Sequence, residues 1–288
     1  MAQTRAAQPE DAQTTVQADR VFASILCAVD GTRRSFDAVA QAAVLAGPQG
    51  RLTLLAVTAV TGGGAYKYAA ISPSRAERIL DRAARIAHRA QVPSTKVIDP
   101  ASPPSQVILE RAAEHDLLAL GAPANSLLGG LLIDGVAASA LGSFTTPLLA
   151  ARPLLAGEHQ FGRRILVASD GLDGSDQLVG LAGRLAREHD ASVILLHAIG
   201  VESRSHPHRI QEQARKLEAV LDGASEVCVE AASAADTILK TAEQATVSLI
   251  VAGSRRLGGL QAIGSVSRQL VHEAHCSVLL VPPERLKG

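Results

Sequence analysis

Short apolar runs alternate along this chain with longer segments whose apolar residues recur at helical spacing. In the first half, the runs predict strands at residues 22–29, 51–60, 94–101, 117–121 and 147–151. The run at 22–29 (FASILCAV) has no polar face, which is typical of a parallel strand that is covered on both sides. Strands that alternate with helices predict right-handed strand–helix–strand units and a doubly wound α/β fold.

The segments between these strands predict helices at residues 36–47, 74–90, 103–116 and 136–143. Ser35 is expected to cap the first helix, and Gly47 suits the position just after its end. Pro73 precedes the second helix, where proline is favoured. Arg184 and Glu188, four residues apart on a later helix, are expected on a solvated surface.

The second half of the chain repeats the first. Residues 25–35 read ILCAVDGTRRS and residues 165–175 read ILVASDGLDGS, so in both an apolar run ends in Asp-Gly and a serine follows five residues after the aspartate. The later elements recur in order, with strands predicted at 163–169, 192–200, 224–231, 248–253 and 277–282, and helices at 177–190, 208–223, 235–246 and 265–275. A repeat of this length predicts two copies of one domain.

The predicted organisation has four parts. Residues 1–20 are polar and are expected to form a disordered tail, residues 21–152 the first domain, 153–162 a linker, and 163–284 the second domain. The tail lacks the apolar core of a signal peptide, and no apolar run has the length of a membrane span. We therefore expect the protein in the cytoplasm.

The composition excludes several classes of function. The 28 basic and 28 acidic residues balance, so neither a nucleic acid nor an anionic membrane is expected as a partner. Aromatic residues make up 2% of the chain, which argues against base stacking and predicts cores of Ala, Leu, Val and Ile. Cys27, Cys228 and Cys276 are too few and too scattered for a disulfide framework, and the first two are expected as small buried apolar residues.

The histidines do not predict a metal site or a catalytic group. His206 and His208, and the set of His272, His275 and Cys276, each lack a further ligand at a familiar spacing. His197, at a strand end, is expected to be packed or hydrogen-bonded. No Ser–His–Asp constellation or paired carboxylate is visible within one half, so the sequence predicts no catalytic residue.

Polar residues and glycines gather where the predicted strands end. Asp30-Gly31 and Asp170-Gly171 each follow the first strand of their half, and Gly121 and Gly253 each end the fourth. In open α/β sheets, ligands bind beyond the carboxyl ends of the strands. These residues are therefore the candidate ligand site of each half.

Residues 253–267 (GSRRLGGLQAIGSVS) leave a strand, pass through a glycine-rich loop and enter a helix. Free N–H groups and the dipole at a helix start favour an anion, and glycine lets the backbone approach a phosphate. Arg255 and Arg256 add charge, and Ser265 and Ser267 add hydroxyl donors. The residues alone equally allow a turn with an ordinary serine cap. The loop matches neither the P-loop pattern nor the dinucleotide-binding pattern.

These features together resemble the universal stress protein family, as a tandem two-domain member, over roughly residues 21–283. The resemblance rests on the Asp after the first strand, the strand–Gly loop, the Gly-Ser-Val-Ser start of the last helix and the ending HCSVLLVP. It implies that each domain is an open five-stranded parallel sheet in the order 3-2-1-4-5, with helices on both faces. It also implies a site for ATP, bound together with Mg²⁺, whose phosphates lie on a loop of pattern G-x2-G-x9-G-[S/T].

Carried over to the second half, the family pattern places Asp170 and Gly171 on the nucleoside side, with Ala198 as the contact from the second strand. Gly253, Gly264 and Ser265 would hold the phosphates, with Val266 and Ser267 following in the same helix start. This half departs from the pattern in two ways, because Arg256 replaces the second glycine and the stretch between Gly253 and Gly264 is two residues short. The charge of Arg255 and Arg256 could compensate.

The first half matches the pattern less well. Asp30, Val57 and Gly121 agree with it, but Ala124 replaces the second glycine and Gly135 is followed by Val136. Asp134 would bring negative charge close to a triphosphate and repel it. We therefore expect a degenerate site in the first half and an adenine nucleotide in the second.

Three functions remain open at this point. The first is a stress-response or regulatory protein that binds ATP or a related adenine nucleotide in its second domain. The second is a protein for dimerisation or partner contact, with vestigial sites and with its fifth strands paired. The third is an enzyme such as a slow ATPase. Pairing of the two domains within the chain, and a homodimer, are the expected assemblies.

Overall fold

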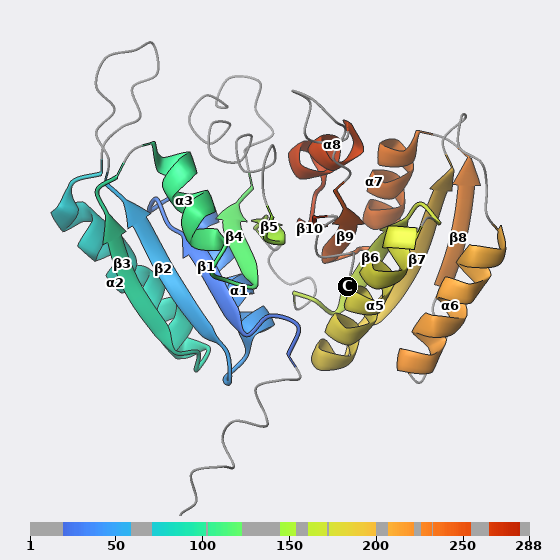
Figure 1. Cartoon of the computed structure of the whole chain (residues 1–288), viewed down its shortest axis with the longest axis horizontal. Helices are drawn as coiled ribbons and strands as arrows, with labels where there is room; N and C mark the ends of the chain where they lie inside the picture. The colour runs from blue at the N-terminus through green and yellow to red at the C-terminus, as the bar shows by residue number, and fades with distance from the viewer. Residues whose placement is uncertain are drawn as a thin grey trace, which may run out of the picture.

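In the part of the chain that the structure describes, ten strands form one sheet in the order β3-β2-β1-β4-β5-β10-β9-β6-β7-β8 (Figure 1). The computed structural model describes residues 20–58, 71–101, 103–122, 145–153, 161–171, 173–199, 207–221, 226–231, 233–254 and 265–282. Each half has the predicted order 3-2-1-4-5, which confirms the α/β doubly wound fold. The two five-stranded sheets are joined into one.

The elements of the first half follow the predicted alternation. They are β1 (Ser24–Ala28), α1 (Arg33–Ala46), β2 (Arg51–Val57), α2 (Pro73–Arg89), β3 (Ser94–Asp99), α3 (Pro104–Ala112), β4 (Leu117–Gly121) and β5 (Leu148–Ala151). Adjacent strands of this half pair in parallel. The helix predicted at 136–143 lies outside the described residues.

The second half repeats this series. Its elements are β6 (Arg164–Ser169), α5 (Asp173–His189), β7 (Ser192–Ile199), α6 (Pro207–Leu221), β8 (Glu226–Ala231), α7 (Ala234–Gln244), β9 (Leu249–Gly253), α8 (Ser265–Glu273) and β10 (Ser277–Val281). These strands also pair in parallel.

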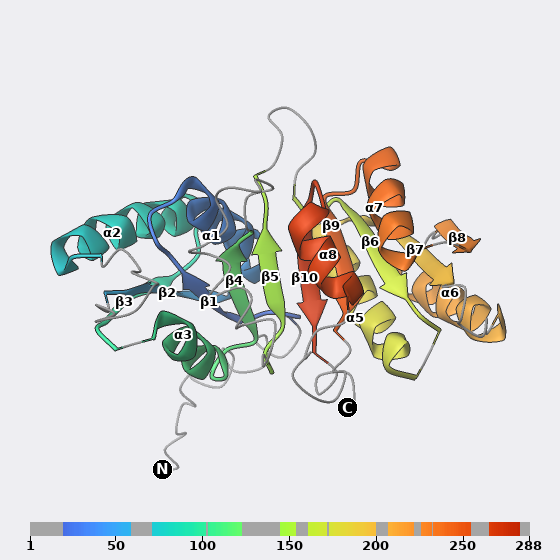
Figure 2. The same ribbon diagram turned by 90° about the horizontal axis from the view of Figure 1, so that it is seen from above.

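The two halves join where their fifth strands meet. β5 and β10 lie side by side and antiparallel, with Leu149 opposite Leu279 (Figure 2). Beside this ladder, the buried Gln41 of α1 donates from Nε2 to the carbonyl of Arg152 at 2.6 Å and accepts from Ser277 Oγ at 2.7 Å. The backbone N–H of Arg152 in turn donates to Ser277 Oγ at 3.0 Å. The junction is therefore fixed by buried hydrogen bonds as well as by strand pairing.

A second polar tie crosses between the halves and corrects a prediction from the sequence. Glu188 was expected on a solvated surface, but it is half-buried and its Oε1 accepts from the backbone N–H of Val21 at 2.8 Å. Its spacing from Arg184 indicated only that the helix face is polar. The partner comes from a segment 167 residues earlier, which a local pattern does not reveal.

The apolar side chains form one core on each face of the sheet. The first joins residues of α1, α2 and α5, together with Leu217 of α6, to one side of the strands. The second joins residues of α3, α7 and α8 to the other side. As predicted, Ala, Leu, Val and Ile dominate both cores.

The two described cysteines behave as small buried residues, as predicted for Cys27. Burial raises the pKa of the Cys27 thiol far above its usual value, and burial raises that of Cys276 to about 12. Both thiols are therefore protonated and unreactive at neutral pH. Cys228 lies in β8, where its side chain falls outside the described part of the chain.

The first helix begins earlier than predicted. Thr32, not Ser35, is the N-cap, and its hydroxyl accepts from the backbone N–H of Ser35 at 3.3 Å. The Ser35 hydroxyl instead donates to the Thr32 carbonyl at 2.9 Å. Gly47 ends the helix with φ +59°, as expected for a C-terminal glycine. Both hydroxyls suit a cap, so the sequence alone did not distinguish them.

Candidate functional site

Three of the predicted site residues of the second half lie at one edge of the sheet. Asp170 follows β6, and Gly253 ends β9, the neighbour of β6. Because Ala168 pairs with Ala252, Gly253 stands level with Ser169. On the other side of β6, Ser169 pairs with His197, so Ala198 of β7 lies one residue beyond that pair, beside Asp170.

The start of α8 lies at the same edge. The hydroxyl of Ser267 donates to the carbonyl of Gly253 at 3.3 Å, and Ser267 is 4% exposed. This bond ties the first turn of α8 to the end of β9. Val266 packs against the core that α3, α7 and α8 share. Ser265 is the first residue of α8, while the predicted residues Arg255, Arg256 and Gly264 lie outside the described residues.

The turn after β6 is held by its own side chains. The Ser175 hydroxyl donates to Asp170 Oδ1, and the Asp170 N–H points back to Ser175 Oγ at 3.3 Å. Gly171 has φ +71°, a conformation that favours glycine, and its N–H donates to Ser169 Oγ at 3.1 Å. The serine that marks the repeat five residues after Asp170 therefore orients this carboxylate.

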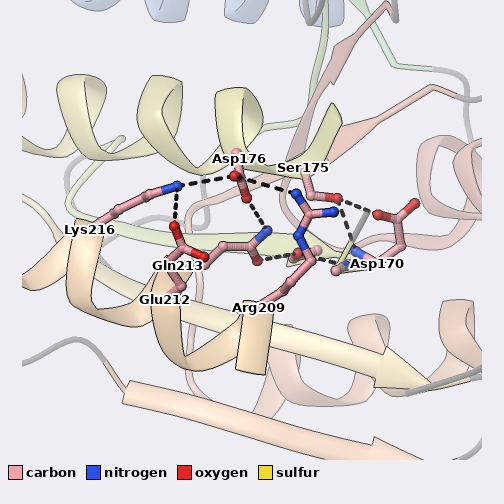
Figure 3. Close-up of polar contacts among 9 residues, drawn as sticks. Asp170, Ser175, Asp176, Arg209, Glu212, Gln213 and Lys216 are labelled. Atoms are coloured by element: carbon pink, nitrogen blue, oxygen red, sulfur yellow. Dashed lines mark hydrogen bonds and ion pairs between the residues drawn. The ribbon is translucent and has the colours of Figure 1, made fainter. Parts of the chain in front are cut away.

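A buried polar chain continues from this turn to α6 (Figure 3). Ser169 donates from Oγ to Gln213 Oε1 at 2.6 Å, and Gln213 donates from Nε2 to Asp176 Oδ1 at 2.7 Å. Gln213 is fully buried. His197 is also buried, with Nδ1 3.0 Å from the Ser169 carbonyl, which confirms it as a hydrogen-bonded residue. The chain connects the sheet edge to α5 and α6.

Asp176 ends this chain among positive charges. Lys216 Nζ lies 3.1 Å from its Oδ2, and an Arg209 guanidinium nitrogen lies 4.0 Å away (Figure 3). Burial favours the neutral carboxyl, but the hydrogen bonds from Gln213 and Lys216 outweigh it and hold the pKa of Asp176 below its ordinary value. The carboxylate is therefore ionised at neutral pH.

Neither Asp176 nor Gln213 was predicted from the sequence. Gln213 lies between Ile210 and Leu217 at helical spacing, so the helix pattern indicates a buried face, but it does not indicate the partners of a buried amide. Asp176 directly follows the repeated serine, where the first half has Phe36. A comparison of the two halves at this position would have singled out Asp176, because one repeat has a charge where the other has a ring.

The equivalent residues of the first half have other partners. Asp30 Oδ1 accepts from the N–H of Thr32 at 2.8 Å and from its hydroxyl at 2.7 Å. Val57 ends β2 and packs on the second core. A Cβ placed on Gly121, at the end of β4, would lie 2.8 Å from the backbone carbon of Arg34. Close packing of α1 thus explains this glycine, while Gly135 lies outside the described residues.

The described residues contain no group of three or more His, Cys, Asp or Glu side chains that could hold a metal ion. Among them, no helix is both long and apolar enough to cross a membrane.

Known proteins resemble the chain in sequence and in fold. The universal stress protein YxiE of Bacillus subtilis (strain 168) is 32% identical over 145 residues, which are 41% of this chain and 97% of that protein. A universal stress protein of Archaeoglobus fulgidus DSM 4304 superposes with a TM-score of 0.75 at 19% identity, covering 91% of this chain and 97% of that one. A putative universal stress protein of Pseudomonas aeruginosa UCBPP-PA14 has a TM-score of 0.65 at 18% identity, with 92% and 95% covered.

The family model also matches the repeat seen in the sequence. The model of the universal stress protein family matches twice, over residues 22–152 and over residues 162–282. The two matches fall on the two halves of the ten-stranded sheet. The chain therefore belongs to the universal stress protein family, as a tandem member with two copies of the family's domain.

Proposed function

We propose that this protein is a stress-response or regulatory protein that binds ATP or a related adenine nucleotide in its second domain. The proposed nucleoside side is formed by Asp170, Gly171 and Ala198. The proposed phosphate side is formed by the loop from Gly253 to Gly264 and by the start of α8. We also propose residues 21–152 and 163–284 as the two domains, 153–162 as their linker and 1–20 as a tail.

The observation that carries this proposal is the bond from Ser267 to Gly253. It brings the N-terminus of α8 to the sheet edge where Asp170 also lies. Free N–H groups at a helix start favour a phosphate, and a carboxylate accepts hydrogen bonds from ribose hydroxyls. A carboxylate suited to the ribose and a helix start suited to the phosphates thus lie at the same edge of the sheet.

The first domain is proposed to be degenerate. The Asp30 carboxylate accepts two hydrogen bonds from Thr32 and the Asp170 carboxylate one from Ser175, so these local bonds do not distinguish the two halves. Gly121 has a packing role under α1, which needs no ligand. Asp134 would add negative charge to the loop that corresponds to the phosphate loop.

Mg²⁺ is proposed only as an ion that arrives with the nucleotide. Mg²⁺ keeps several waters and is commonly held by one or two carboxylates together with substrate phosphates. Asp170 is a carboxylate at this edge, and the described residues contain no group of three or more side chains that could hold a metal ion by themselves. The phosphates and water, rather than the protein, would therefore supply most of the ligands of Mg²⁺.

Matched substitutions in the full chain test the proposal. Asp170→Ala should weaken ATP binding, since one hydrogen bond to a charged group contributes about 1.5–3 kcal/mol, whereas Asp30→Ala should leave it unchanged. Isothermal titration calorimetry with ATP measures both, and circular dichroism checks that both variants are folded. Equal effects, or an effect of Asp30→Ala alone, would contradict a site in the second domain.

A second pair of titrations locates the phosphates. Gly264→Val should place a branched side chain where the backbone meets the phosphate, and so reduce the affinity for ATP far more than that for adenosine. If both affinities fall equally, the variant is misfolded or the phosphates do not contribute. If neither falls, the phosphates lie elsewhere.

The alternative function, dimerisation or partner contact with vestigial sites, is constrained by one observation. The fifth strands already pair with each other inside one chain. A homodimer, which stays a prediction, would therefore need a surface other than these two strands. Sedimentation of the full chain with and without ATP would show whether assembly depends on the nucleotide.

A further inference from the structure

Helix α2 of the first domain carries a stripe of arginines. Counting from Arg75, they recur at intervals of three, four, three and four residues, which places them on one helix face. The stripe consists of Arg75, Arg78, Arg82, Arg85 and Arg89, all exposed. The same helix has two acidic residues, and one of them, Asp81, pairs with Lys96 at 2.8 Å.

The first three arginines of the stripe line one side of a shallow pocket of about 290 Å³. Its lining is completed by Gly31, Phe36 and Ile79. The Arg82 guanidinium lies 4.2 Å from the centre of the Phe36 ring, an arrangement typical of a cation–π contact. Gly31 has φ +88°, and a Cβ there would lie 2.8 Å from Ile79 Cδ1. The pocket thus has a floor of apolar side chains and a rim of guanidinium groups.

No ion pair within the described residues neutralises these rim charges. Within the described part of the chain, Arg75, Arg78 and Arg82 have no carboxylate at ion-pair distance. The loop at 59–70, which precedes α2, contributes Lys67 and no acidic residue to the sequence. Guanidinium groups gathered without a counter-charge repel one another, and an anion between them removes that repulsion.

The second domain treats the corresponding place differently. Its helix α6 aligns with α2 through the pairs Arg78-Ile79 and Arg209-Ile210, and there Asp176 lies close to the charges of Arg209 and Lys216. The first domain has Phe36 in place of Asp176. In the second domain a carboxylate of the protein therefore pairs with the cations at this place, whereas in the first domain the arginines are available to an external anion.

We propose that this pocket of the first domain binds a small phosphate monoester. The phosphate lies between Arg75, Arg78 and Arg82, because guanidinium groups match phosphate oxygens in geometry and charge. The organic body packs on the exposed side of the Arg82 guanidinium, whose other side covers Phe36. This pocket borders the family's nucleotide site, because Gly31 directly follows Asp30, but it lies on the other face of the sheet. Phe36 and Ile79 belong to the core on the α1–α2 face, whereas Val57 packs on the opposite core.

The test uses phenyl phosphate and the full chain, at constant ionic strength in a buffer without phosphate. The variant is Arg75→Gln with Arg78→Gln, which keeps the stack of Arg82 on Phe36 and so preserves the fold. The matched control is Arg85→Gln with Arg89→Gln, which removes the same charge from the same stripe away from the pocket. Calorimetry should show at least about a tenfold weaker affinity for the variant and an unchanged affinity for the control.

Two further probes separate the contributions of the phosphate and of the ring. Inorganic phosphate should bind more weakly than phenyl phosphate and show the same dependence on the variant, and phenol should not bind. Equal losses in the variant and the control would indicate a general attraction of anions to the stripe, such as a polyanion would use, and would overturn the proposal. Failure of phenyl phosphate to bind the unaltered chain, or binding insensitive to both pairs, would overturn it as well. None of these changes touches the second domain, so ATP binding there is judged independently.

Discussion

The two domains solve the same packing problem with different chemistry. The residue that follows the repeated serine is Phe36 in the first domain and Asp176 in the second. Phe36 is covered by Arg82 of α2, at 4.2 Å from the ring centre. Asp176 accepts from Gln213 of α6, which stands at the position aligned with Arg82. A cation–π contact and a buried amide thus occupy equivalent places between equivalent helices.

The difference shows which features of the repeat are shared and which are specific. Both halves keep the strand order, and Ile79 and Ile210 are buried at aligned positions. The apolar pattern therefore maintains the fold in both copies. Both halves also keep the Asp-Gly pair and the serine at the sheet edge, but the residues beside them differ, and they form an open arginine pocket in one copy and an internal ion network in the other. We therefore expect a function that is specific to one domain at aligned positions that differ in charge.

The largest expected effect comes from breaking the buried network of the second domain. Gln213→Leu would leave the Ser169 hydroxyl and the Asp176 carboxylate without their buried partner. Each unsatisfied group costs about 1–3 kcal/mol, so we expect a loss of roughly 3 kcal/mol in the free energy of unfolding. The midpoint of urea unfolding measures it.

The aligned change in the first domain serves as the control. Arg82→Gln removes an exposed cation–π contact, which contributes about 0.5–1 kcal/mol. Comparable shifts of the midpoint in the two variants would show that the buried amide has no special role.

A smaller loss is expected where the two domains join. Gln41→Leu would remove the hydrogen bond that the Arg152 carbonyl accepts and the one that the Ser277 hydroxyl donates, beside the β5–β10 ladder. We expect a loss of about 2 kcal/mol, because the Arg152 N–H still donates to Ser277 Oγ. Gln106→Leu, which removes an exposed bond to Glu110, is the matched control. Hydrogen exchange of the β5 and β10 amides should rise in the first variant, and equal protection in both would show that strand pairing alone holds the halves together.

Local sequence patterns were sufficient to predict the strands and most helix positions. The apolar residues that mark these elements are the ones that pack into the two cores. The patterns also placed Asp170 and Gly253 at one edge, since the ends of parallel strands meet there. They were insufficient for Ser35, because two hydroxyls near a helix start can both cap it. They were also insufficient for Glu188 and Gln213, whose partners lie far away in sequence. Polar partners across a fold have no periodicity, so only the structure reveals them.

A change at Gly121 tests whether the first-domain site is a packing feature. Gly121→Ala would bring a Cβ to 2.8 Å from the backbone of Arg34, so α1 must shift, at a cost of about 1–3 kcal/mol. The affinity for ATP should not change. Gly180→Ala, in α5, where nothing lies within 4 Å of the added carbon, should instead stabilise by about 0.5–1 kcal/mol. Weaker ATP binding in a folded Gly121→Ala variant would contradict a degenerate first site.

The smallest effects are expected from two aspartates near the starts of α1 and α5, and they should have opposite signs. Hydrogen bonds from Gln213 and Lys216 outweigh burial and lower the pKa of Asp176 from 3.8. Its contribution is therefore complete above pH 3.8 and is lost as the pH falls through the lower folded value. Burial, opposed by Arg33, raises the pKa of Asp37 from 3.8. Ionised Asp37 therefore costs stability above its folded pKa, and this cost disappears as the pH falls toward 3.8.

Substitution by asparagine separates the two aspartates. At pH 7, Asp176→Asn should lower the melting temperature and Asp37→Asn should raise it slightly. Asp37 Oδ2 is buried and has no hydrogen-bond partner within the described residues, so an uncharged amide is the better occupant there. Melting curves between pH 3 and pH 7 should show both differences shrinking toward acid, that of Asp37→Asn first. A gain from Asp37→Asn that persists unchanged at pH 3 would mean that shape rather than charge is responsible, and the contrast between the two helix starts would then be one of packing alone.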